Sequence, residues 1–158
     1  MTKRKIRHAL YNAAQWTWGL PQTLAGAGLY VKHRHEPHFN YNGAKVTAWS
    51  RDSGISLGKF IFVPREKGSN SGTSYGTDDT EKAKTPEVSR FLLDHEYGHS
   101  LQSLILGPAY LLLVGAPSFA WNRLPYFARK RKKTGRSYYS AVFERTASHL
   151  GEKHGSKK

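Results

Sequence analysis

Residues 86–99 read PEVSRFLLDHEYGH, and this stretch predicts the central helix of the fold. Its apolar residues and its two histidines recur at intervals of three or four positions, which is the spacing of one helical face, so the histidines continue the stripe that faces the core. Thr85 is a suitable N-cap, and Pro86 fits the first helical position. The sequence therefore predicts a helix that begins at Pro86 and turns both histidines inward.

The same stretch contains the motif HExxH, with His95 and His99 around Glu96. Two imidazoles four residues apart lie about one helical turn apart, roughly 6 Å between their Cβ atoms, so they can share one metal ion. A zinc ion held by such ligands lowers the pKa of its water to about 7, and the glutamate then takes a proton as that water attacks a carbonyl. The motif predicts zinc-dependent hydrolysis with Glu96 as the base; two surface histidines on an ordinary helix are the alternative. Gly98 is either a place where another chain segment approaches or incidental.

A tetrahedral catalytic zinc needs a third protein ligand, and Glu144 is the first choice. It lies in residues 138–150, whose apolar side chains recur with helical spacing, so this segment can pack against the HExxH helix. His149 is the second choice for the third ligand. The competing interpretation of Glu144 is a solvated carboxylate paired with Arg145 or another base.

The composition restricts both the chemistry and the partners of the chain. The chain contains no cysteine, which excludes disulfides, cysteine nucleophiles and thiolate metal sites. A formal net charge of +14 favours anionic partners such as nucleic acid, an anionic lipid surface or acidic proteins, although the charges could simply maintain solubility. The first residues are basic, but no compact apolar core follows them, so we expect no cleavable signal peptide and a cytoplasmic or membrane-associated protein.

The 158 residues have the size of one domain, which we expect to cover residues 1–151. Residues 45–50 (KVTAWS) and 55–63 (ISLGKFIFV) have the composition of strands and are separated by turn residues, so they predict a β-hairpin. Residues 64–85 are polar and predict a flexible surface loop. Residues 152–158 predict a disordered basic tail.

Two uncharged runs, residues 9–31 and 100–122, reach the length of a membrane span. A straight helix over the second run would separate His99 from Glu144 by the thickness of the hydrocarbon layer, which is incompatible with a shared zinc. We therefore expect a broken hydrophobic helical hairpin, interrupted near Pro108 and Pro117. Attachment of either run to a membrane surface remains an alternative.

Two blocks resemble a family of small bacterial proteins of the zinc metallopeptidase type. Residues 95–103 match HEYGHxxQS and residues 106–118 match LGPxYLLxxGxPS, and residues 18–22 and 56–62 also look like that family. The resemblance covers most of the chain outside the polar loop and the tail. It implies peptide or protein substrates but no particular one.

An HExxH helix followed by a glutamate on a later helix also resembles the gluzincin group of zinc metallopeptidases. Their ExxxD-like motif would run from Glu144 to Ser148, so the resemblance implies that Ser148, in place of the usual aspartate, orients a ligand histidine. It further implies a mainly helical, zincin-like α+β domain with a small sheet beside the HExxH helix. In such enzymes an edge strand pairs with extended substrate, and the two predicted strands are candidates.

A stabiliser for the negatively charged oxygen that forms during hydrolysis could come from Tyr138, Tyr139, Arg145 or His149, and the sequence does not rank them. A competing class of function is a basic module that binds membrane or nucleic acid and carries a vestigial or structural zinc site. Aromatic residues alternate with bases over residues 121–139, which suits base stacking and phosphate contact, but no nucleic-acid-binding signature accompanies them.

Overall fold

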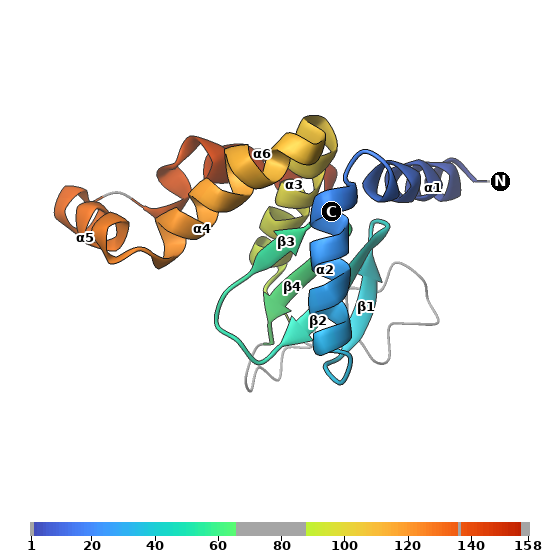
Figure 1. Cartoon of the computed structure of the whole chain (residues 1–158), viewed down its shortest axis with the longest axis horizontal. Coiled ribbons are helices and arrows are strands. Elements are labelled where there is room, and N and C mark those ends of the chain that lie inside the picture. The colour runs from blue at the N-terminus through green and yellow to red at the C-terminus, as the bar shows by residue number, and fades with distance from the viewer. Residues whose placement is uncertain (1, 66–87, 136, 156–158) are drawn as a thin grey trace.

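The computed structural model describes residues 2–65, 88–135 and 137–155, which form a mixed α+β fold (Figure 1). A small sheet lies between helices, and the helical part predominates, as the sequence predicts. The helices are α1 (Lys3–Trp16), α2 (Leu20–Lys32), α3 (Arg90–Leu106), α4 (Ala116–Arg123), α5 (Pro125–Thr134) and α6 (Val142–His154). The strands are β1 (His38–Tyr41), β2 (Ala44–Trp49), β3 (Ile55–Leu57) and β4 (Phe60–Pro64).

The four strands are arranged in the order β1-β2-β4-β3. Strands β1 and β2 form one antiparallel hairpin and β3 and β4 form another, while β2 and β4 run parallel. The predicted hairpin between residues 45–50 and 55–63 is therefore wrong. The second segment is not a single strand, because Gly58, with φ of +59°, turns the chain between β3 and β4. This turn places β3 at the edge of the sheet and leaves β4 parallel to β2.

The two faces of the sheet are covered by different helices. Ile61 and Val63 of β4 pack against α3 in the larger core cluster, which also contains Leu93 and Tyr97. The alternate residues Phe60 and Phe62 face α2 in the smaller cluster. This division follows from the alternation of side chains along a strand. Figure 1 shows α2 in front of the sheet, with α3 on its other side. Helix α6 then packs on α3, away from the sheet.

The start of α3 differs from the prediction. The helix begins at Arg90, with Ser89 as the N-cap, whose hydroxyl accepts from the backbone N–H of Leu92. Val88, which was expected in the helix, instead pairs with Arg65 in an isolated β-bridge. The predicted cap and first residue, 85 and 86, lie outside the described residues, as does most of the predicted loop 64–85.

The two uncharged runs do not form continuous helices. The first is divided between α1 and α2, and the second is interrupted at Gly107, whose φ of +54° ends α3. The break predicted near Pro108 is thus present. The break predicted near Pro117 is wrong, because this proline lies in the first turn of α4, where it needs no backbone N–H donor, and α4 directly follows the short helical stretch Leu111–Gly115. Within the described ranges, no helix combines the length and the apolar character needed to cross a membrane.

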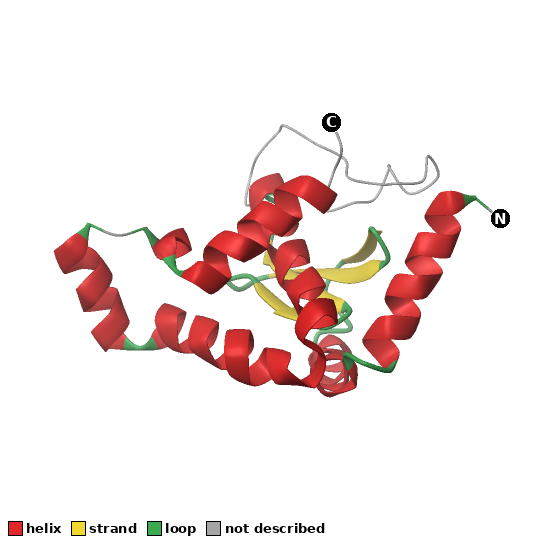
Figure 2. Cartoon of the chain, turned by 90° about the horizontal axis from the view of Figure 1, so that it is seen from above, coloured by secondary structure: helices red, strands yellow, loops and turns green. Residues whose placement is uncertain are grey.

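The C-terminal end of the described chain is more ordered than predicted. Helix α6 extends to His154, so the first three residues of the predicted disordered tail 152–158 are helical. Residues 156–158 lie outside the description. Figure 2 shows α5 at the end of the molecule opposite the N-terminus.

Candidate metal centre

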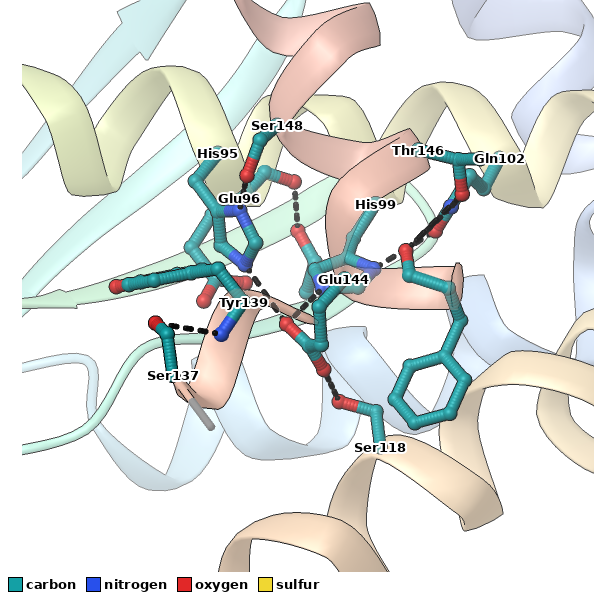
Figure 3. Close-up of polar contacts among 12 residues, drawn as sticks. His95, Glu96, His99, Gln102, Ser118, Ser137, Tyr139, Glu144, Thr146 and Ser148 are labelled. Carbon is teal, nitrogen blue, oxygen red and sulfur yellow. Dashed lines mark hydrogen bonds and ion pairs between the residues drawn. The ribbon is translucent and has the colours of Figure 1, made fainter. Parts of the chain in front are cut away.

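Three of the predicted site residues converge in the interior. His95 and His99 of α3 and Glu144 in the first turn of α6 are 3%, 5% and 0% exposed, respectively. Oε2 of Glu144 lies 3.0 Å from Nε2 of His95 and 3.4 Å from Nε2 of His99 (Figure 3). One ligand atom of each residue lies within 4.8 Å of the others, and the three could hold a metal ion. His149, the alternative third ligand, is an exposed residue of α6 and does not belong to this group.

Two glycines allow the two helices to approach closely enough for these contacts. A Cβ atom at Gly98 of α3 would lie 1.8 Å from the backbone oxygen of Ala147 in α6. A Cβ atom at Gly151 of α6 would lie 1.9 Å from the backbone oxygen of Asp94 in α3. Any larger residue at either position would push the helices apart, so the small residue between the histidines marks a close approach of another segment.

Each of the three residues also has a polar neighbour on the side away from the shared centre. Ser148 Oγ lies 2.9 Å from Nδ1 of His95, and Ser118 of α4 donates to Oε1 of Glu144 at 2.5 Å. Ser148 is therefore placed where the gluzincin resemblance expects an orienting group. Ser118 was not predicted, because nothing in the sequence relates it to a glutamate 26 positions away.

Gln102 fixes the second histidine. Its Nε2 donates to the backbone oxygen of Phe143 at 2.8 Å and to Oγ1 of Thr146 at 2.7 Å, which leaves its Oε1 directed at Nδ1 of His99, 2.8 Å away. Since an amide oxygen only accepts, Nδ1 of His99 carries a proton, and Nε2, which faces Glu144, is the nitrogen that would bind a metal. The contact of Gln102 with His99 is not among the predictions from the sequence, although a glutamine three residues after a histidine on one helix is within reach of it.

The charges of the group are strongly coupled. Burial opposes ionisation of Glu144, but hydrogen bonds from His95 and His99 outweigh it and hold the pKa of this carboxyl well below its usual range. Burial alone would lower the pKa of His99, yet its hydrogen bond to Glu144 and the charge of Glu96 raise that pKa. The centre thus has a net attraction for positive charge, which a proton supplies in the absence of a cation.

Glu96 is buried beside this group but is not part of it. Its side chain is 5% exposed, and its Oε2 has no hydrogen-bond partner among the described residues. Burial raises its pKa, while the neighbouring His99 and His95 partly oppose the rise. Its backbone oxygen accepts from Oγ of Ser56 at 2.6 Å, and Gly54 leaves room for the carboxylate, because a Cβ there would lie 2.2 Å from Oε1. A buried carboxylate without a partner is costly, and such groups are concentrated at functional sites.

Of the four candidate stabilisers, the structure brings Tyr139 to the site. Its ring lies 4.9 Å from the ring of His95, edge to face, and it lines a small recess of about 220 Å³ together with Glu96. Burial raises the pKa of Tyr139, and the charges of Glu96 and Glu144 add to the rise, so its hydroxyl stays protonated. Arg145 and His149 are exposed on α6, and the side chain of Tyr138 lies outside the description.

A larger cleft of about 430 Å³ opens above Glu96 and His99. Strand β3 forms one wall, and the segment from Leu111 to Arg123 forms the other. Most of the lining is apolar, with side chains contributed by Leu29, Trp49, Ile55, Leu57, Tyr110, Leu111 and Phe119. We call this space the main cleft and the smaller one beside Tyr139 the Glu96 recess.

No protein-family model, curated protein or solved structure matches the chain. The chemistry of the site is therefore inferred from the arrangement of its own residues alone.

Proposed function

We propose that this protein is a zinc-dependent hydrolase of the metallopeptidase type, with a zincin-like domain and a gluzincin-like set of ligands. The observation that carries the proposal is the convergence of His95, His99 and Glu144 in the interior, next to the unpartnered carboxylate of Glu96. A pair of buried histidines with only a structural role would need no second buried carboxylate beside it.

The donor set suits zinc. Two imidazole nitrogens and one carboxylate oxygen are typical of catalytic zinc sites, whereas calcium and magnesium prefer oxygen ligands alone. Ser148, Gln102 and Ser118 each hold one donor by a further hydrogen bond, as outer neighbours of a metal site do. A bound zinc supplies a Lewis acid and lowers the pKa of water at the site.

Glu96 acts as the general base in this proposal. Its carboxylate takes one proton as the oxygen of water bonds to the carbonyl carbon of the substrate, and it then gives that proton to the leaving nitrogen as the C–N bond breaks. Its raised pKa brings it closer to the working pH of such a proton carrier. The protonated hydroxyl of Tyr139 is the candidate donor to the substrate oxygen on which negative charge develops.

The main cleft suits an extended peptide. Strand β2 is flanked by β1 and β4 and cannot accept a further strand, which removes one of the two sequence candidates for substrate pairing. Strand β3 lies at the edge of the sheet, and residues 54–57 line the main cleft next to Glu96. A substrate that adds to β3 by backbone hydrogen bonds would thus pass over the site, with its side chains against the apolar walls.

Metal analysis of three purified variants tests the proposal. We expect one zinc per chain in the wild type and in Glu96→Gln, and none in His95→Ala, with hydrolysis of a mixed peptide library lost in both variants. His149→Ala is the matched control, because this histidine is exposed and lies outside the ligand group, so zinc and hydrolysis should be retained. A folded wild type that takes up no zinc would refute the proposal. If Glu96→Gln hydrolysed peptides as fast as the wild type, Glu96 could not be the base.

The competing binding module makes a different prediction. It would bind nucleic acid or anionic vesicles in a salt-sensitive manner, and chelation would leave that binding unchanged. The hydrolase instead loses its activity when zinc is removed and regains it when zinc is restored.

A further inference from the structure

A third space adjoins the candidate site and is lined only by polar and charged residues. It has a volume of about 470 Å³ and lies between the loop from β2 to β3 and the C-terminal end of α4. We call it the arginine recess. Its lining residues are Arg51, Asp52, Ser53, Asn122 and Arg123.

The arginine recess adjoins the other two spaces. Ser53 and Asn122 line the main cleft, the Glu96 recess and the arginine recess, so the three spaces are neighbours. Arg51 and Arg123 also line the main cleft, one from each wall. On α4, Asn122 lies one helical turn after Ser118, the residue that donates to Glu144, so one face of this helix serves both the ligand group and the arginine recess.

The charges in the arginine recess are unbalanced. The lining includes two arginines and a single acidic residue, Asp52, and neither arginine is in an ion pair within the described part of the chain. By contrast, Arg65 pairs with Glu36 at 2.8 Å elsewhere on the surface. The guanidinium of Arg51 lies over the ring of Trp49, 5.2 Å from its centre, which restricts its position without neutralising its charge.

We propose that the arginine recess binds a carboxylate group of the substrate, either an aspartate or glutamate side chain close to the scissile bond or the carboxylate at the C-terminus of a peptide. This inference rests on the proposed function, since it assumes that a peptide occupies the main cleft. Guanidinium groups bind carboxylates through two parallel hydrogen bonds, which fix the orientation of the bound group as well as attract its charge. The recess thus selects acidic peptides and fixes how they are placed over Glu96.

Binding of three labelled peptides to zinc-loaded Glu96→Gln tests the proposal without hydrolysis. The peptides share one core: the first has an internal glutamate and an amidated C-terminus, the second has glutamine there and the same amide, and the third has glutamine and a free C-terminal carboxylate. We expect the first or the third to bind about tenfold more tightly than the second, equivalent to about 1.4 kcal/mol. Whichever of the two does so identifies the source of the carboxylate.

Substitutions assign the preference to the recess. Adding Arg51→Gln or Arg123→Gln should reduce the preference for the acidic peptide about tenfold and leave the neutral peptide unaffected. Arg129→Gln is the matched control, because it removes the same charge from an exposed position on α5 that does not line the recess. Equal affinity for all three peptides, no binding of any of them, or an equal effect of Arg129→Gln would overturn the inference.

Cleavage of the same peptides by the wild type separates the two proposals. Cleavage without a preference for either carboxylate would support the proposed hydrolase activity and refute the proposed carboxylate subsite. A preference in binding without cleavage of any peptide would support the carboxylate subsite and refute the proposed hydrolase activity.

Discussion

Replacement of Gly98 by alanine should destabilise the fold and weaken zinc binding together. In an ordinary helix this substitution stabilises by about 1 kcal/mol, because alanine is the better helix former. Here the added Cβ would lie 1.8 Å from the backbone oxygen of Ala147, whereas real Cβ contacts are essentially never shorter than 3.0 Å. Helices α3 and α6 must therefore separate by about 1.2 Å, the difference between these two distances.

The size of the effect follows from the kind of contact. Overpacking costs roughly 1–3 kcal/mol, and a clash with backbone belongs at the upper end, since no side chain can rotate away from it. After the gain in helix propensity is subtracted, we expect a net loss of about 2 kcal/mol, or a melting temperature lowered by roughly 4–8 °C for a chain of this size. The same movement carries Glu144 away from His95 and His99, and because metal distances tolerate only about 0.2 Å, zinc affinity should fall at least tenfold.

Gly28→Ala is the matched control. Gly28 is also in a helix, α2, but a Cβ there would meet nothing within 4 Å, so alanine should stabilise the protein by about 1 kcal/mol and leave zinc binding unchanged. Thermal unfolding of both metal-free variants, followed by zinc titration against a competing chelator, measures both effects. If Gly98→Ala matched Gly28→Ala in stability and the wild type in zinc affinity, the close packing of α3 on α6 would not be what positions Glu144.

Three further predictions concern the neighbours of the ligands and the metal itself. Gln102→Leu removes the acceptor for Nδ1 of His99 and should weaken zinc binding roughly 10–100-fold in the same chelator competition. Ser118→Ala removes the donor to Glu144 and should weaken zinc binding about tenfold. It should also destabilise the metal-free protein by about 1–3 kcal/mol, because Oε1 of a buried carboxylate loses this hydrogen bond. Zinc at 100 times its dissociation constant should stabilise the wild type by about 2.7 kcal/mol in thermal unfolding, and a similar rise in His95→Ala would contradict the ligand assignment.

The histidine pair could be predicted from the sequence because the information is local. One helical turn separates His95 from His99, so the two share a face of the helix. The apolar spacing did not identify the buried face correctly, because Phe91 is 53% exposed whereas Leu93 is fully buried in the core. Glu144 is a different case, since the residues alone left it open against His149. The structure distinguishes them by burial, because position 144 faces α3 and position 149 faces outward.

The strand pairing could not be predicted because it depends on one residue. Residues 55–63 have the composition of a single strand, and the positive φ of Gly58 divides them. A glycine within an apolar strand-like segment is also compatible with a bulge, so the composition did not identify the turn. The consequence is functional, because the turn brings β3 to the edge of the sheet beside the main cleft. The start of α3 was misplaced for a related reason: Val88 fits the helical stripe but forms a bridge with Arg65.

Whether a metal at the proposed centre would be catalytic or structural depends on what lies beside the three candidate ligands. A structural site is closed by four protein ligands, whereas a catalytic site keeps one position for water. Among the described residues the ligand group has three members. Glu96 lies beside it with Oε2 unpartnered, and it lines both the Glu96 recess and the main cleft. Burying that carboxylate costs folding free energy and adds nothing to a closed site. The same carboxylate is what an attacking water requires, so the position of Glu96 favours catalysis.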